Sequence, residues 1–185
     1  MNSLIETIDH ITYEVTRHFG NLNSRDLNDK PSASQWSIAQ NLQHIIIVNE
    51  SYLPVIKKLR NKSYKAGWLT RQAFLVKLTG KKILESVQPV VKKKIKTFEE
   101  WKPLENMVIE DIIPKFDTHQ QLLKELILSS QDLIDAGTVI HSPVNRLIVY
   151  SLEDAFKIMV AHEERHLNQA KEVLFLQLSE RLNIV

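Results

Sequence analysis

The chain has 185 residues, of which 43% are hydrophobic and 25% charged, so it can form one ordinary globular domain with a substantial core. It has no cysteine, which excludes disulfide bonds, a cysteine nucleophile and thiolate metal ligands. The longest purely aliphatic run covers residues 45–48 and is too short to cross a bilayer, and the N-terminus lacks the pattern of a secretory signal. We therefore expect a cytoplasmic protein with no membrane partner.

The formal net charge of +2 is unevenly distributed. Residues 57–102 contain 14 Lys or Arg residues and three acidic residues, whereas the rest of the chain has an excess of acidic residues. A basic segment is thus placed within an acidic frame.

The first two predicted helices cover residues 4–19 and 37–60. In the first, apolar residues repeat at steps of three and four, which is typical of an amphipathic helix, and Gly20 follows its last turn. The second begins with "SIAQ", a capping box in which Ser37 and Gln40 satisfy each other's backbone amides. Pro54 is expected to kink this helix.

The last two predicted helices begin at Asp117 and Ser151. Asp117 suits an N-cap, a stripe of Leu and Ile follows it, and Gly137 is expected to end this third helix. The fourth continues to about Leu178. Its expected inner residues are Phe156, Met159, Val160, Leu167, Ala170 and Leu174.

No segment alternates apolar and polar residues convincingly, and the best strand candidate, residues 146–152, is short. The pattern predicts an all-α four-helix bundle with unusually long connections. The crossover between the second and third helices, residues 61–116, is too long to be all coil. Within it, residues 70–80 predict a short helix closed by Gly80, and the remainder is expected to wrap around the bundle as a loop.

Near the C-terminus, "AHEERHLNQ" contains the spacing H-E-x-x-H at residues 162–166. Two histidines four positions apart leave the same face of a helix and can bind one metal ion. A zinc peptidase, however, takes its third ligand from farther along the chain, and no histidine follows His166. We therefore do not interpret the motif as a peptidase signature.

His44 is the candidate for an upstream third ligand. It lies among the apolar residues of the second helix, where an imidazole points into the bundle. If the second and fourth helices are neighbours, His44 can meet His162 and His166. Three neutral imidazoles that leave positions for water make a reactive metal site. The alternative is two surface histidines and one hydrogen-bonded histidine in the core.

Two stretches resemble signatures of the DinB-like superfamily. "WSIAQNLQHIIIVNESYL" (36–53) resembles the first, and "HSPVNRLIVYSLEDAFKIMVAHEERHLNQAKEVL" (141–174) resembles the second. The resemblance covers essentially the whole chain and implies one domain, residues 1–185. It also implies a four-helix bundle with a long crossover and a histidine triad that binds a divalent metal ion, often nickel or zinc. Carried over to this chain, the triad is His44, His162 and His166.

The resemblance leaves the reaction open, because similar proteins include thiol S-transferases, metal-dependent hydrolases and proteins without a known reaction. We expect an enzyme that acts on a small-molecule substrate, and a transferase would use a low-molecular-weight thiol because the chain has no cysteine. Glu163, Gln169 and Gln40 are candidates for supporting the ligands, although Glu163 is equally compatible with a solvated acid.

Two alternatives remain. One is a non-catalytic metal- or ligand-binding protein, related to stress, that would use the same histidines. The other is nucleic-acid binding, in which the basic crossover contacts phosphates while Tyr64, Trp68 and Trp101 stack on bases. The absence of a known recognition motif disfavours the second. His119 is expected at the surface, and the sequence leaves homodimerisation open.

Overall fold

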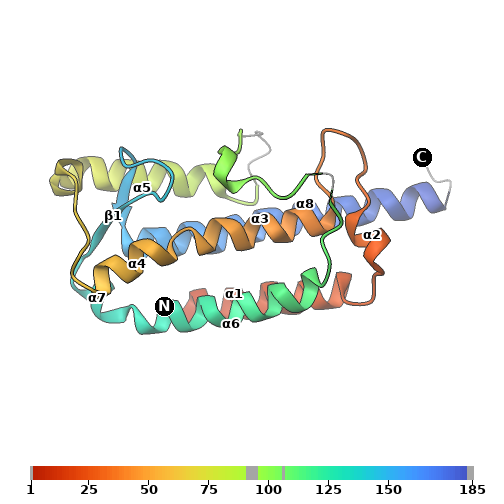
Figure 1. Ribbon diagram of the computed structural model, residues 1–185, viewed down its shortest axis with the longest axis horizontal. Helices are drawn as coiled ribbons and strands as arrows, with labels where there is room; N and C mark the ends of the chain where they lie inside the picture. Colours follow the sequence, from red (N-terminus) through yellow and green to blue (C-terminus); the bar gives the residue numbers. More distant parts are fainter. Residues whose placement is uncertain (1, 91–95, 106, 183–185) are drawn as a thin grey trace.

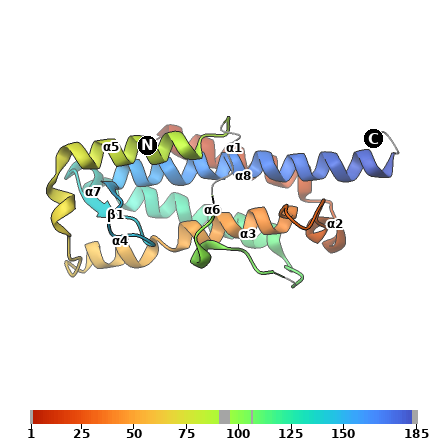
Figure 2. The ribbon, with the colours of Figure 1, turned by 90° about the horizontal axis from the view of Figure 1, so that it is seen from above.

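The computed structural model describes residues 2–90, 96–105 and 107–182 of the chain. Four long helices run along the molecule and form its bundle (Figures 1 and 2). They are α1 (Asn2–Phe19), α3 (Ile38–Glu50), α6 (Ile112–Ser129) and α8 (Leu152–Arg181). Helix α8 contacts both α1 and α3, and α6 contacts the same two helices, so the predicted four-helix core is confirmed.

Further helices and two strands pack around the bundle. A fifth helix, α5, lies along α8 and carries a large part of the crossover (Figure 1). The elements outside the four-helix bundle are α2 (Ser24–Asn28), α4 (Leu53–Arg60), η1 (Trp68–Arg71), α5 (Ala73–Val87), η2 (Glu99–Trp101), α7 (Gln131–Asp135), β1 (Val139–His141) and β2 (Val149–Ser151). None of the helices in the described ranges combines the length and hydropathy needed to cross a bilayer.

The start of α3 has the predicted capping box. The Ser37 hydroxyl accepts from the Gln40 amide at 3.1 Å, and the Gln40 side-chain oxygen accepts from the Ser37 amide at 3.2 Å. Ser151 caps α8 in a similar way by accepting from the Asp154 amide at 3.0 Å. The helices that carry the predicted histidines therefore begin at fixed residues.

The predicted second helix is two helices rather than one kinked helix. Helix α3 ends at Glu50, and α4 begins at Leu53 with Pro54 in its first turn. Proline has no amide hydrogen to donate to the carbonyl of Glu50, and its ring would clash with that carbonyl in a continuous helix. In a first turn the missing hydrogen is not needed, so the chain restarts there.

The predicted bounds of the third helix are wrong at both ends. Helix α6 begins at Ile112, five residues before Asp117, because the buried Ile112 and Phe116 extend its apolar face. It ends at Ser129, and the short α7 follows as a separate helix. Gly137 follows α7 with φ of 65°, a left-handed conformation that glycine adopts without steric cost.

Gly80 does not close the crossover helix, contrary to the prediction, but lies in the middle of α5. It is buried against β2 and the start of α8. A Cβ atom at this position would come within 2.8 Å of the Asp154 carboxylate and 3.4 Å of the Tyr150 Cβ. Glycine therefore allows the close approach of α5 to the bundle, and the helix continues for seven more residues.

A two-stranded antiparallel ribbon of β1 and β2 is added to the predicted helices, and β2 lies within residues 146–152, the best strand candidate of the sequence. Ile140 pairs with Tyr150, and both side chains are buried. Each strand has only three residues, too few to give an alternating sequence pattern. The ribbon matters for the site because it directs Tyr150 into the interior at the start of α8.

Candidate metal centre

The structure brings together the three predicted histidines, His44 from α3 and His162 and His166 from α8. One ring nitrogen from each lies within 4.8 Å of those of the other two. The Nε2 atom of His162 is 3.0 Å from Nε2 of His166 and 3.4 Å from Nε2 of His44. Helices α3 and α8 pack side by side, so residues more than a hundred positions apart face one point.

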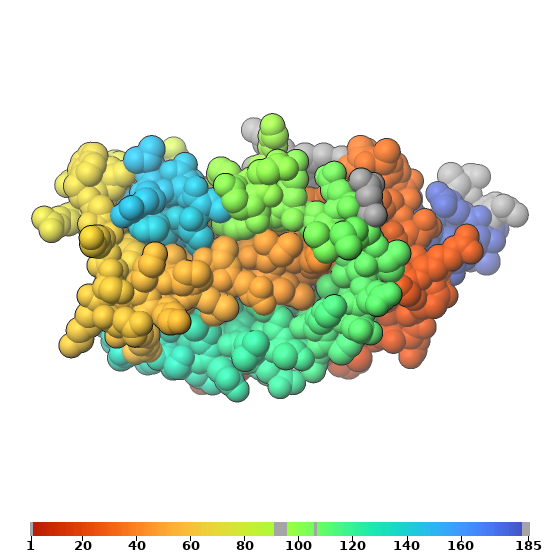
Figure 3. All heavy atoms as spheres, in the orientation of Figure 1, coloured from red at the N-terminus to blue at the C-terminus, as the bar shows by residue number. Residues whose placement is uncertain are grey.

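The tautomer of His44 is set by the crossover. Its Nδ1 atom lies 2.6 Å from the backbone carbonyl oxygen of Trp101 in η2. A carbonyl oxygen only accepts, so Nδ1 carries the hydrogen and Nε2 keeps its lone pair for the cluster. Figure 3 shows the segment around η2, in light green, lying over α3, in orange.

His166 is held in the same tautomer by a side chain of α3. Its Nδ1 atom lies 2.9 Å from Oδ1 of Asn41. The Asn41 amide nitrogen donates to the Ser37 carbonyl at 2.9 Å, which leaves the amide oxygen facing His166. Nδ1 of His166 is therefore the donor, and its Nε2 lone pair also points into the cluster.

Burial keeps the three imidazoles neutral. It lowers the pKa of His44 to about 4 and, together with the nearby His44, the pKa of His162 to about 3. Burial also holds the pKa of His166 well below its usual value, with the two other histidines acting in the same direction. All three are unprotonated at neutral pH, the state in which histidine binds metal.

The donor set fits a divalent ion. Nitrogen ligands about 2.0–2.1 Å from a tetrahedral zinc ion lie about 3.4 Å apart, close to the two Nε2 separations of the cluster. Two Nδ1 hydrogens are satisfied on the outer side, as is usual for metal-bound histidine. Three neutral nitrogen ligands suit zinc, nickel, iron or copper, and three ligands leave further coordination positions for other groups.

Trp36 covers the cluster from outside the helix pair. Its ring stacks on His166 with centroids 5.7 Å apart, and it lies 4.8 Å from the His44 ring. His44 and His166 are buried, whereas His162 is partly exposed where it borders a cavity. A ligand of the ion would therefore approach from the side of His162.

Glu163 is not a solvated acid, and it does not face the cluster. Its side chain is fully buried and accepts from Asn49 of α3 at 2.6 Å and from Gln120 of α6 at 3.0 Å. Burial raises its pKa to about 8, although the two amide hydrogen bonds act in the opposite direction. This orientation differs from the general-base role of the glutamate in H-E-x-x-H peptidases.

His119 belongs to the same buried network, so the expectation that it lies at the surface is wrong. It is 7% exposed, and its Nε2 atom is 3.1 Å from the Asn49 amide nitrogen. Burial lowers its pKa to about 4. Four polar side chains from α3, α6 and α8 thus form a second interior cluster beside the histidine triad.

Gln169 and Gln40, the other two residues expected to support the ligands, have different hydrogen-bond partners. Gln169 forms a side-chain hydrogen bond with His166, which raises the pKa of that histidine against the effect of burial. Gln40 instead completes the capping box and donates to the Leu104 carbonyl at 2.9 Å. It holds the crossover against α3, as does Gln43, which accepts from the Leu104 amide at 2.7 Å.

Sequence reasoning missed the two groups that orient the rings. Asn41 lies three residues before His44, and its position one turn after the Ser37 cap was a usable signal for a side chain turned inward. The Trp101 carbonyl is a backbone group 57 positions from His44, and no residue pattern marks it.

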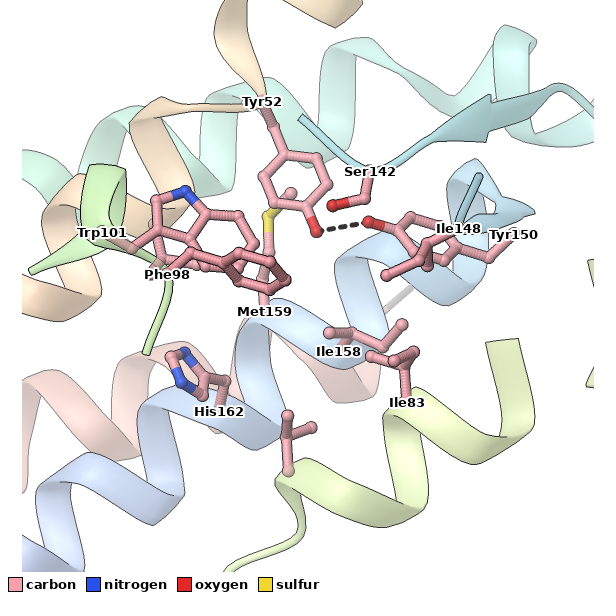
Figure 4. A pocket seen from close by; sticks show the side chains of 12 residues that line it. Tyr52, Ile83, Phe98, Trp101, Ser142, Ile148, Tyr150, Ile158, Met159 and His162 are labelled. Atoms are coloured by element: carbon pink, nitrogen blue, oxygen red, sulfur yellow. Dashed lines mark hydrogen bonds between the residues drawn. The ribbon is translucent and has the colours of Figure 1, made fainter. Parts of the chain in front are cut away.

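An apolar cavity begins at His162 and extends between α3, α5, α8 and the β-ribbon (Figure 4). Phe98 and Trp101 form one side of it, and isoleucines form much of the opposite side. At the end away from His162, the hydroxyls of Tyr52 and Tyr150 lie 2.7 Å apart. The cavity gives a small molecule access to the open side of the cluster.

The fold and the cluster define a helical-bundle protein with a three-histidine centre of the kind that holds a divalent metal ion. Residues 7–170 match the model of the DinB superfamily, which covers most of the chain. The chain belongs to this superfamily, as its two signature-like stretches predict. Comparisons with curated proteins and with solved structures found no significant match.

Proposed function

We propose that the protein is a divalent-metal-dependent enzyme that acts on a small molecule, either as a hydrolase or as a thiol S-transferase. The observation that carries this proposal is the convergence of three imidazole Nε2 atoms at the end of an apolar cavity. A closed structural site would have no reason to border such a cavity, whereas a reactive site requires one.

The residues of the chain have separable roles in this proposal. His44, His162 and His166 supply the ligands, while Asn41 and the Trp101 carbonyl fix two of the rings. A divalent ion held there polarises a substrate oxygen or lowers the pKa of a water or thiol that binds it. The apolar walls exclude bulk water, which strengthens electrostatic effects at the centre.

Nucleic-acid binding receives little support from the basic crossover. Of the three aromatic residues considered for stacking, Tyr64 stacks on His141 and Trp101 borders the cavity, so only Trp68 projects into solvent. Lys57, Lys58, Arg60, Lys62, Lys65 and Lys96 are exposed. Lys92, Lys93 and Lys94 lie outside the described residues.

Metal content is the first test. We expect about one equivalent of zinc or nickel in protein purified without a histidine tag, and loss of most of it in His162→Ala. His10→Ala is the matched control, because His10 is exposed on α1, and it should keep the metal. Elemental analysis gives the measurement. Full metal content in His162→Ala would contradict the proposal.

Turnover is the second part of the same test. A panel of low-molecular-weight thiols with an electrophile, and a model amide without a thiol, separates transferase from hydrolase. We expect His44→Ala and His166→Ala to lose at least about a hundredfold in rate, a loss typical of removing a catalytic metal or its support. Metal binding without turnover on either panel would favour the non-catalytic alternative.

A further inference from the structure

The cavity beside His162 is lined by uncharged and mostly apolar side chains. The described residues that border it include no Lys, Arg, Asp or Glu, although a quarter of the chain is charged. Its few polar side chains are those of His162, Ser142, Tyr52, Tyr150 and Trp101, the last through its indole nitrogen. An ionised group placed there would lose its hydration without gaining a partner of opposite charge.

The two tyrosine hydroxyls at the far end form a hydrogen-bonded pair that has one hydrogen to spare. Tyr52 and Tyr150 hydrogen bond to each other at 2.7 Å, and Ser142 also borders this end of the cavity. Two phenolic hydroxyls carry two hydrogens, and the bond between them uses one. One donor is left for an acceptor on a bound molecule. Burial raises the pKa of Tyr150 to about 12, so this end stays neutral.

The space between the two ends suits a flat or branched apolar body. Phe98 and Trp101 meet edge to face with centroids 5.5 Å apart, and Ile83, Ile148 and Ile158 lie across the cavity from them (Figure 4). The cavity has a volume of about 90 Å³, so the body that it holds must be small.

We infer that this cavity binds an uncharged, largely apolar small molecule with an aromatic or branched aliphatic body. One oxygen of the molecule faces His162, and a hydrogen-bond acceptor at the other end meets the hydroxyl pair of Tyr52 and Tyr150. This inference rests on the proposed function for the His162 end, because the facing oxygen is the atom on which the metal would act.

The inference separates two kinds of substrate. A neutral ester, amide, ketone or aromatic electrophile fits within the walls. A thiol that carries several carboxylates can enter only with its charged groups left at the mouth, since none of the described lining residues offers them a cationic partner. The neutral reactant therefore occupies the cavity, whichever nucleophile is used.

Three probes of similar size test this: acetophenone, ethylbenzene and benzoate. Binding is measured by ligand-observed NMR on the protein as purified and after chelation, because benzoate can also bind a metal ion directly. In the chelated protein we expect acetophenone to bind at least about tenfold more tightly than benzoate. We also expect the double substitution Tyr52→Phe and Tyr150→Phe to abolish the preference for acetophenone over ethylbenzene, because it removes both hydroxyls of the pair.

Ile83→Trp fills the cavity from its α5 wall and should abolish binding of both neutral probes. Leu122→Trp, at an exposed position of α6, is the matched control and should leave binding unchanged. If circular dichroism shows that Ile83→Trp is unfolded, Ile148→Trp takes its place. Benzoate binding as tightly as acetophenone after chelation, or neutral probes unaffected by a folded cavity-filling variant, would overturn the inference. Metal content is measured separately, so a failure of the proposed metal-dependent function can be told apart from a failure of this inference.

Discussion

Asn41 shows how a single residue determines the chemistry of a neighbouring ring. Its amide nitrogen is held by the Ser37 carbonyl, so its oxygen can only face His166 and accept the Nδ1 hydrogen. Supporting hydrogen bonds of this kind orient a metal-bound imidazole and raise its basicity.

Asn41→Leu keeps the branched shape of this side chain but removes the acceptor. We expect divalent-metal affinity to fall about 10- to 100-fold, as is usual when such a partner is lost. Competition with a chromophoric chelator measures the affinity. Asn168→Leu is the matched control, because Asn168 is exposed on α8 two residues after His166. Asn41→Asp, which keeps an acceptor, should restore most of the affinity; equal affinity in Asn41→Leu and wild type would contradict this role.

The three histidines could be predicted from the sequence, but the surroundings of Glu163 could not. Spacing along one helix places His162 and His166 on one face, and an isolated His44 in an apolar stretch indicates an inward ring. Glu163 lies on the same helix, and its burial depends on amides supplied by Asn49 and Gln120 from two other helices. Such partners are brought together only by the tertiary fold.

At the scale of elements, the apolar stripes predicted the long helices because burial of one face repeats over several turns. The breaks were harder to locate, since Glu50 and Leu53 lie in a run that is helical on both sides. The interior position of Gly80 was also hidden, because glycine looks like a helix end unless the close approach to Asp154 is known.

The cap of α3 is the element-level feature with the clearest energetic prediction. Ser37→Ala removes the acceptor for the Gln40 amide, and we expect about 1 kcal/mol lower free energy of unfolding. Denaturant titration gives the value. Ser34→Ala, which changes an exposed serine three residues earlier, should alter stability by less than about 0.5 kcal/mol. Equal effects of the two substitutions would show that the cap contributes nothing specific.

For the whole molecule, buried neutral histidines make the fold sensitive to acid. His119 has a pKa of about 4 in the folded chain against an ordinary value of 6.5, so the unfolded chain binds more protons between these values. The stability associated with neutral His119 is fully present above pH 6.5 and is lost as the pH falls toward 4. The three histidines of the triad act in the same direction.

His119→Gln separates this contribution from that of the triad. With a chelator present, the stability advantage of the wild type over the variant should shrink by at most about 3 kcal/mol between pH 7 and pH 4. Urea unfolding at a series of pH values measures the difference. An advantage that stays constant over this range would mean that His119 titrates alike in the folded and unfolded chains.

Two consecutive residues of α8 fix how that helix is turned about its own axis. The His162 side chain points toward His44, while the Glu163 side chain points to another side of the helix and accepts hydrogen bonds from amides of α3 and α6. A small roll of α8 would strain one set of bonds or the other. Glu163 thus limits rotation of α8 about its axis, and this keeps the His162 ring close to the ring of His44 from α3.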